Sequence, residues 1–171
     1  MLKLVLRELS ADDEAAARAA HAQLLGDDFE FLLGDSSRPW VEYMHELEEM
    51  RRGINLPDGF VPATFFGAFV GGELVGRVSV RHELNDYLLA RGGHIGYAVL
   101  PAHRRRGYGT EILAQALRYC ASELGLDRVL VTFDETNAGS RAVIEANGGV
   151  LEDVREFDGE RVRRYWIALV Q

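Results

Sequence analysis

The chain is poor in cysteine, and this shortage bears on the redox state of the compartment in which we expect it. Its 171 residues include one cysteine, Cys120, so no internal disulfide can form. Proteins of oxidising compartments often depend on such bridges, and we therefore expect a reducing compartment and a cytoplasmic location. Cys120 stands between Tyr119 and Ala121 in a helical pattern, which favours a packed thiol over a nucleophile.

Long apolar runs and an excess of positive charge are also missing. No stretch approaches the ~20 apolar residues that a membrane helix needs, and the apolar run in residues 2–9 is too short for a signal peptide. Lysine and arginine number 19 against 27 aspartates and glutamates, giving a formal net charge of −8. This charge repels nucleic acid and anionic membranes, so we expect neither as a partner. It suits a cationic partner, although acidity also keeps proteins soluble.

The sequence does contain enough apolar material for a core. Apolar residues make up 47% of the chain, and no linker or repeat interrupts it, so we predict a single domain over 1–171. Alternating apolar residues predict strands, and helical spacing predicts helices. The predicted strands are 2–9, 63–70, 74–81, 94–100, 128–133, 150–157 and 161–169, and the predicted helices are 11–25, 39–53, 107–124 and 137–147.

The order of these elements predicts an α/β fold with a mixed sheet. Gly71-Gly72 and Asp158-Gly159 are hairpin signals, so the strands beside them should be antiparallel. Strand–helix–strand crossovers occur only in the second half, where we expect parallel pairing. Helices should cover both faces of the sheet. Residues 85–91 form a polar link whose structure the pattern does not decide.

Residues 99–110 have the features of a phosphate-binding loop. A strand ends, arginines fill positions 104–106, and Gly107 and Gly109 open a long helix. The first turn of a helix has unpaired N–H groups and partial positive charge, and glycine lets a ligand approach them, so a diphosphate fits. The alternative is a plain turn beside solvated arginines. Nucleotidase and dinucleotide loops fit less well, since no Lys-Ser or Lys-Thr follows the glycines and position 112 is Ile.

The spacing Arg104-x-x-Gly107-x-Gly109 resembles the Q/R-x-x-G-x-G/A acetyl-CoA motif of the GNAT N-acetyltransferase superfamily. Asn137-Ala-Gly-Ser140, followed by Glu145 and Gly148, is similar to a second signature of that family. The element order also looks like the GNAT fold. The resemblance covers essentially the whole chain, most strongly residues 93–149, and points to a bacterial branch of the superfamily.

The resemblance implies acetyl-CoA as co-substrate and no metal. The backbone amides and arginines of the loop would take the pyrophosphate, the strand end would pair with the pantetheine arm, and the next helix start would reach the thiol end. For this, strands 94–100 and 128–133 must splay apart. The implied cofactor residues are Ala98, Val99, Arg104, Arg105, Arg106, Gly107, Tyr108, Gly109, Thr110, Asn137 and Ser140. Asn137 also suits a helix cap, which is compatible with a ligand contact.

The implied reaction is direct transfer of an acetyl group to a primary amine, with a backbone amide near Val99 stabilising the oxyanion. Two usual catalytic positions depart from the family pattern: the acidic tyrosine is replaced by Ile144, and the basic glutamate by Gly93. Glu83 and His94 are substitute candidates, although strand alternation puts His94 and Tyr97 on opposite faces. Several tyrosines are possible acids, and proximity alone could suffice.

The implied acceptor is a small-molecule amine or a peptide. Acidic residues at 27, 28, 30, 46, 48 and 49 suggest a cationic amine, with a charged outer helix face as the simpler explanation. A non-catalytic acyl-CoA-binding domain and a protein lysine or N-terminal acetyltransferase are the alternatives. The apolar strand at 165–170 could pack inside or form a homodimer contact.

Overall fold

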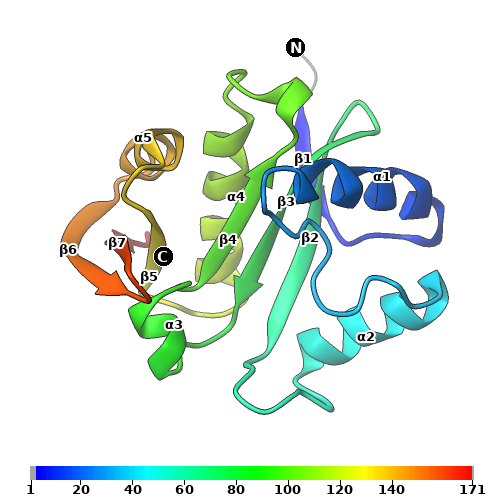
Figure 1. Ribbon diagram of the computed structural model, residues 1–171, viewed down its shortest axis with the longest axis horizontal. Coiled ribbons are helices and arrows are strands. Elements are labelled where there is room, and N and C mark those ends of the chain that lie inside the picture. Colours follow the sequence, from blue (N-terminus) through cyan, green and yellow to red (C-terminus); the bar gives the residue numbers. More distant parts are fainter. Residues whose placement is uncertain (1–2, 171) are drawn as a thin grey trace.

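The computed structural model describes residues 3–170. Its larger sheet has four strands and runs through the middle of the molecule (Figure 1). They are β1 (Leu4–Arg7), β2 (Ala63–Val70), β3 (Glu73–Arg81) and β4 (Ile95–Val99), in the order β1-β2-β3-β4. All neighbouring pairs are antiparallel. Gly71 and Gly72 both have positive φ, 58° and 82°, and form the β2–β3 turn, as the hairpin signal predicts.

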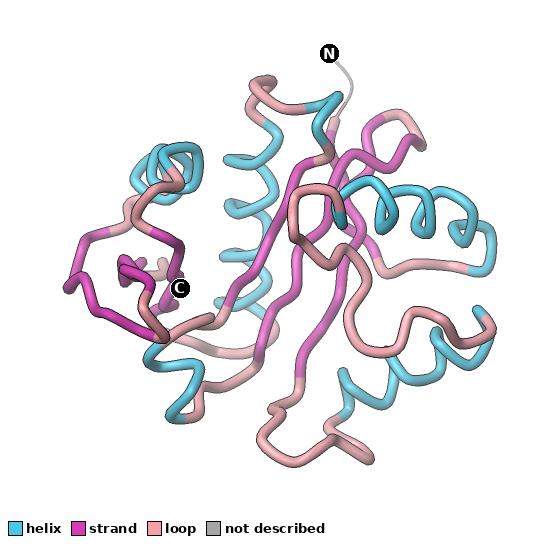
Figure 2. The backbone as a smooth tube through the Cα atoms, viewed as in Figure 1, coloured by secondary structure: helices cyan, strands magenta, loops and turns pink. Residues whose placement is uncertain are grey.

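The second sheet has three strands, β5 (Arg128–Asp134), β6 (Val150–Phe157) and β7 (Glu160–Ala168), in the order β5-β7-β6. Both pairs are antiparallel. The β6–β7 hairpin turns at Asp158 and Gly159, whose φ angles are 51° and 79°. This sheet lies on the far side of α4 (Tyr108–Ser122) from the first two helices (Figure 2).

The helices cover both faces of the larger sheet. On one face lie α1 (Glu14–Leu25), which follows a 3₁₀ turn at Ala11–Asp13, and α2 (Trp40–Arg52). On the other face lies α4, with α5 (Ala138–Ala146) beside it (Figure 1). The polar link at 85–91 contains a short helix, α3 (Asp86–Ala90), because the side chain of Asn85 caps it by accepting from the N–H of Leu88.

Two apolar clusters hold these layers together. One packs α4 against β3, β4 and the second sheet, through residues such as Val78, Ile112 and Ile167. The other packs α1, α2 and the segment between them against β2, around Phe31 and Tyr43. Strand β4 lies between the two clusters and contributes side chains to both, so it connects the two packed layers.

The predicted parallel pairing is wrong as a ladder, because β4 and β5 belong to separate sheets. They touch where β4 begins: the N–H of His94 donates to the carbonyl of Leu130 at 2.8 Å, and the N–H of Gly92 donates to the Thr132 hydroxyl at 2.7 Å. Beyond these contacts the strands diverge. The splay that the resemblance requires is therefore present, and it leaves one edge of β4 open.

Candidate active site

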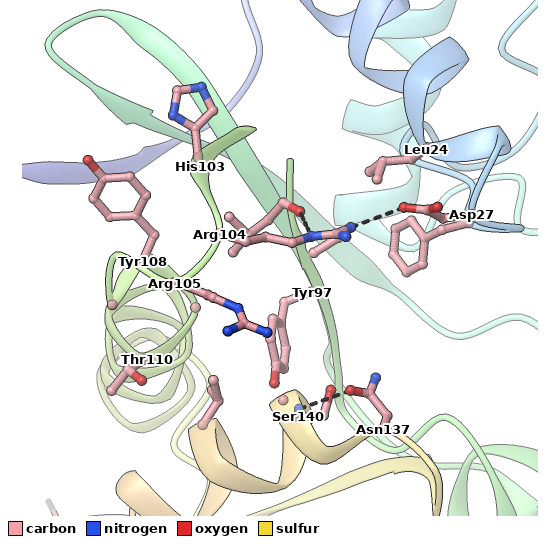
Figure 3. Close-up of a pocket in the computed structure, with 17 residues that line it drawn as sticks. Leu24, Asp27, Tyr97, His103, Arg104, Arg105, Tyr108, Thr110, Asn137 and Ser140 are labelled. Atoms are coloured by element: carbon pink, nitrogen blue, oxygen red, sulfur yellow. Dashed lines mark hydrogen bonds and ion pairs between the residues drawn. The ribbon is translucent and has the colours of Figure 1, made fainter. Parts of the chain in front are cut away.

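A cleft of about 680 Å³ lies over the open end of β4 (Figure 3). It is bounded by the end of β4, the loop into α4, the start of α5, and the end of α1 with its following loop. The lining residues are Leu24, Asp27, Phe29, Tyr97, Ala98, Val99, His103, Arg104, Arg105, Gly107, Tyr108, Gly109, Thr110, Asn137, Gly139, Ser140 and Val143. Every cofactor residue that the sequence predicts is in this set except Arg106.

The start of α4 supplies the anion-binding part of the cleft. Gly107 takes a left-handed conformation, with φ 82°, and its carbonyl accepts the N–H of Glu111 at 3.2 Å. The N–H groups of Tyr108, Gly109 and Thr110 precede that bond and have no partner within the helix. Three adjacent donors at the positive end of a helix have the chemistry that suits a phosphate group.

Gly109 keeps the cleft open. A Cβ at this position would lie 3.3 Å from Cγ2 of Val143 on α5 and 3.7 Å from Cγ2 of Val99 on β4. Any longer side chain would enter the slot between α4, α5 and β4. This space therefore exists because the residue is glycine.

The three arginines of the loop have different positions. The Nε of Arg104 donates to the carbonyl of Val99 at 3.0 Å, and its Nη2 lies 3.3 Å from the carboxylate of Asp27. Arg105 extends into the cleft toward Tyr97 (Figure 3). Arg106 is exposed and does not line the cleft. Two of the three predicted cations thus line the cleft beside the start of α4.

The backbone of β4 offers an unpaired edge. The even-numbered residues of this segment form the hydrogen bonds to β3. At one end the N–H of Arg81 donates to the carbonyl of His94, and at the other end the N–H of Leu100 donates to the carbonyl of Val75. In an antiparallel ladder the intervening residues point their N–H and C=O groups the other way. Tyr97 and Val99 therefore turn theirs toward the gap beside β5, where the Val99 carbonyl accepts from Nε of Arg104 and the Val99 N–H has no partner in the ladder. Ala98 lines the cleft, but its backbone faces Arg77 on β3.

The start of α5 closes the cleft on the far side of that gap. The side chain of Asn137 accepts a hydrogen bond from the N–H of Ser140 at 3.1 Å, as a helix cap does (Figure 3). Both residues also line the cleft. The cap and the site position coexist, because capping uses one oxygen of Asn137 and leaves its amide NH₂ available.

A second cleft, of about 440 Å³, continues from the first between β4 and β5. The two share Phe29, Tyr97, Asn137 and Ser140. The remaining lining residues are Asp28, Arg81, Arg91, Gly92, Ile95, Gly96, Val131, Thr132, Phe133, Asp134, Ile144 and Val162. The shared residues mark a junction where a molecule in one cleft can meet a molecule in the other.

Tyr97 stands at this junction. Its hydroxyl is buried and has no hydrogen-bond partner of ordinary geometry within residues 3–170, although the Ser140 side chain lies next to it (Figure 3). Burial raises the pKa of Tyr97, and the nearby Ser140 hydroxyl opposes that shift in part. The phenol therefore keeps its proton at neutral pH, and the Ser140 hydroxyl is the polar group beside it.

The two predicted catalytic substitutes lie elsewhere. Glu83 is exposed and lines neither cleft. His94 is 5% exposed, and its Nδ1 accepts the N–H of Leu130 at 3.0 Å. Burial, followed by the charge of Arg81, lowers the pKa of His94 to about 4. The structure therefore gives His94 a role in joining the sheets and brings neither residue to the junction.

The two departures from the family pattern have structural reasons. Gly93 has φ 60°, and a Cβ there would overlap the carbonyl of Leu130. No side chain can occupy that position without moving β5. Ile144 is fully buried in the core cluster beneath α5, although it borders the second cleft. A base at 93 and an acid at 144 are therefore absent for packing reasons as well as by residue type.

The acidic residues that suggested a cationic acceptor are mostly paired. Asp27 pairs with Arg104, while Glu46 contacts Arg38 at 3.0 Å. Glu48 and Glu49 pair within α2, with Arg51 and His45. Asp28 lines the second cleft and is the member of the set placed near the junction. The group does not act as one negative surface.

Sequence reasoning missed the side of the cleft that comes from the first half of the chain. Leu24, Asp27 and Phe29 lie more than 60 positions before the loop motif; no local pattern marks Leu24 and Phe29, and the sequence noted Asp27 only in the acidic group assigned to the acceptor. Their contribution depends on α1 crossing the sheet near the end of β4. His103, Gly139 and Val143 stand within or next to the predicted motifs, and proximity to those motifs is the signal that could have found them.

A family model described as an acetyltransferase (GNAT) domain matches residues 3–150. This chain belongs to the GNAT acetyltransferases. Over 74 residues it is 34% identical to the uncharacterised N-acetyltransferase YoaA of Bacillus subtilis, a stretch that is 43% of this chain and 40% of that protein. The aligned part is thus less than half of the curated relative.

Solved structures support the same fold. Mycobacterium smegmatis RimJ, in complex with a CoA disulfide, has a TM-score of 0.73 at 23% identity, covering 96% of this chain and 81% of that one. RimL, a ribosomal L7/L12 alpha-N-protein acetyltransferase in complex with coenzyme A, has a TM-score of 0.69 at 17% identity, covering 97% and 94%. A spermidine N-acetyltransferase SpeG chimera from Vibrio cholerae and hSSAT has 0.61 at 20%, covering 96% and 95%. At these identities the likeness concerns the fold.

Two further features concern possible partners. None of the helices in residues 3–170 is both long and apolar enough to cross a membrane. Within the same residues, no group of three or more histidine, cysteine, aspartate or glutamate side chains is arranged to hold a metal ion.

Proposed function

We propose that this GNAT protein transfers an acetyl group from acetyl-CoA to a primary amine by direct attack. One observation carries the proposal: a helix N-terminus with free N–H donors opens into a cleft that follows the unpaired edge of β4 and ends where a second cleft begins. A long cofactor with an anionic head and a reactive tail matches this shape. The acceptor then comes from the opposite side.

The residues present fit coenzyme A. The N–H groups of Tyr108, Gly109 and Thr110 bind the pyrophosphate, with Arg105 adding charge. The pantetheine amides pair with the open backbone of Val99 and Tyr97 as an added strand would. This places the thioester at the junction of the clefts, beside Asn137 and Ser140.

The chemistry at the junction forms one bond and breaks one. The neutral amine attacks the thioester carbon, and an outward N–H of β4 stabilises the oxyanion. The C–S bond then breaks, and the sulfur takes a proton from the hydroxyl of Tyr97. The attacking nitrogen loses its extra proton to water, and Tyr97 regains a proton from water. The products are an N-acetyl amine and coenzyme A.

The absence of the usual acid and base favours a second candidate, an acyl-CoA-binding domain without turnover. Neither Gly93 nor Ile144 can transfer a proton. The two candidates share the cofactor cleft and differ at Tyr97. Release of free thiol in the presence of amines distinguishes them.

Thermal unfolding tests the cofactor cleft. Acetyl-CoA and coenzyme A should raise the Tm of the protein, while ATP at the same concentration should raise it much less. Gly109→Trp should abolish the shift because the indole fills the slot between α4, α5 and β4. Arg118→Trp is the matched control, since it adds the same side chain at an exposed position of α4. Equal protection of the Gly109→Trp variant would disprove this binding mode.

A further inference from the structure

Two arginines of β3 are partly or fully buried without a carboxylate partner. Arg77 is 4% exposed, and Arg81 is partly buried at the wall of the second cleft. The other arginines of residues 3–170 either form an ion pair or are exposed. A buried charged side chain normally pairs with a group of opposite charge, because removing a charge from water is costly.

Carbonyl oxygens take the place of that counter-charge. The Nη1 of Arg81 donates to the carbonyl of Gly92 at 2.8 Å and to that of Gly93 at 3.2 Å. Arg77 donates to the carbonyls of Gly96 and Glu30, at 3.1 and 2.9 Å, and its buried Nε has no partner within residues 3–170. These contacts satisfy some N–H groups but neutralise neither charge.

The two guanidinium groups lie together beside the junction. A Cβ at Gly96 would be 3.7 Å from Nη2 of Arg81 and 3.8 Å from Nη1 of Arg77. Gly96 is the residue before Tyr97, so Arg81 is close to the point where the clefts meet. Burial lowers the pKa of both arginines, and Arg81 adds repulsion at Arg77. An anion at this point would be held by uncompensated positive charge.

The other charges of the second cleft are largely occupied. Arg91 forms an ion pair with Glu160. Asp134 accepts from the N–H and the hydroxyl of Thr136, at 2.9 and 2.6 Å. Asp28 has no such partner in the described residues and faces the same cleft. The charges of the cleft that lack an ion-pair partner in the described residues are thus Arg81 at the wall, Asp28 on the loop after α1 and Asp134 at the end of β5.

We propose that the second cleft selects a small acceptor that carries a carboxylate close to its amine, such as an amino acid, with Arg81 binding the carboxylate. The inference rests on the proposed acetyl transfer. Asp28 attracts the ammonium form as it arrives. The cavity of about 440 Å³ has the size of a small-molecule site, which favours a free amino acid over a protein segment. Four of the six acidic residues that suggested a cationic acceptor already pair with an arginine or a histidine, which leaves them less charge for an acceptor.

Matched acceptors test the inference. Thiol release from acetyl-CoA is measured with a panel of amino acids, the primary amide of each, and polyamines. The amide keeps the α-amine and side chain and lacks the carboxylate charge. We expect kcat/KM to be about 10- to 100-fold higher for the best amino acid than for its amide, the range for a hydrogen bond to a charged group. An amide or polyamine that equals or exceeds every amino acid would overturn the proposal.

Arg81→Gln gives the second arm of the test. Glutamine retains a donor for the Gly92 carbonyl but has no charge, so kcat/KM for the amino acid should fall by about 10-fold or more and approach that for the amide. Arg81→Lys should recover part of the preference, and Arg118→Gln, an exposed arginine on α4, serves as control. Equal loss for amino acid and amide would assign Arg81 a structural role only and overturn the proposal.

Thermal shifts distinguish failure of the acceptor assignment from failure of the proposed acetyl transfer. If acetyl-CoA protects the protein and Arg81→Gln alike but no amino acid is acetylated or adds stabilisation, the acceptor assignment fails and the cofactor cleft stands. If acetyl-CoA does not protect the wild-type protein, the proposed transferase activity itself fails, and the acceptor assignment with it.

Discussion

His94 and Leu130 are joined by hydrogen bonds in both directions. The N–H of His94 donates to the Leu130 carbonyl at 2.8 Å, and the N–H of Leu130 donates to Nδ1 of the His94 imidazole at 3.0 Å. The pair lies where β4 begins to separate from β5. It therefore fixes the closed end of the splay whose open end forms the larger cleft.

His94→Ala should destabilise the protein by about 1–3 kcal/mol, because the buried N–H of Leu130 loses its partner. The pH dependence should also change. The pKa of His94 is about 4 in the folded protein and near 6.5 when unfolded, so the unfolded state binds more protons between these values. This contribution to stability is complete above pH 6.5 and declines as the pH falls toward 4.

Urea unfolding at several pH values measures both effects. The dependence between pH 6.5 and 4 should be shallower in His94→Ala than in the wild-type protein. His45→Ala removes an exposed histidine of α2 and should retain the wild-type slope. Identical slopes in His94→Ala and wild type would contradict the prediction.

Gly93→Ala should destabilise the protein by about 2–5 kcal/mol, the sum of two costs. The left-handed conformation costs a non-glycine residue about 1–2 kcal/mol, and overlap with the Leu130 backbone adds about 1–3 kcal/mol. Gly59→Ala is the matched control: its φ is also positive, at 81°, but a Cβ there meets nothing. It should show the conformational cost alone. A smaller loss for Gly93→Ala than for Gly59→Ala would show that β5 moves freely.

Tyr97→Phe should lower kcat by about 100-fold, the low end of the range for a general acid, because coenzyme A can leave slowly as a thiolate. The Tm shift with acetyl-CoA should be retained, since the hydroxyl forms no hydrogen bond of ordinary geometry in the described residues. Tyr119→Phe alters a hydroxyl that contacts Thr64 instead, and should leave kcat near the wild-type value. A Tyr97→Phe enzyme with normal kcat would remove this residue from the mechanism.

Asp27→Asn should tighten acetyl-CoA binding slightly. The Asp27–Arg104 pair is about half exposed, at 52% and 48%, so it stabilises by only about 0.2–1 kcal/mol. Releasing Arg104 toward the phosphates should lower the Kd by up to about fivefold at low salt, and less at high salt. Asp12→Asn makes the same charge change at the other end of α1 and controls for net charge. Weaker binding in Asp27→Asn would show that Asp27 positions Arg104 for the cofactor.

The sequence predicted elements best where the chain itself signals them. Strands Ala63–Val70 and Val150–Phe157 have the predicted bounds, since each is joined to the next strand by a two-residue turn of positive φ. The helix Asp86–Ala90 was not predicted, because its five residues depend on one cap, Asn85. The expected parallel ladder was wrong because crossovers indicate strand direction and do not show whether neighbouring strands stay in contact.

By itself, the sequence determined the loop chemistry of the cleft at the start of α4. Free N–H groups at a helix start, glycines at 107 and 109, and a helix cap at Asn137 are local properties, since each depends on residues a few positions apart. Tertiary structure alone decided the rest of the site. The open edge at Tyr97 and Val99, the approach of Asp27 and the burial of Arg81 arise from segments distant in sequence, and their energies depend on solvent exclusion that no local pattern contains.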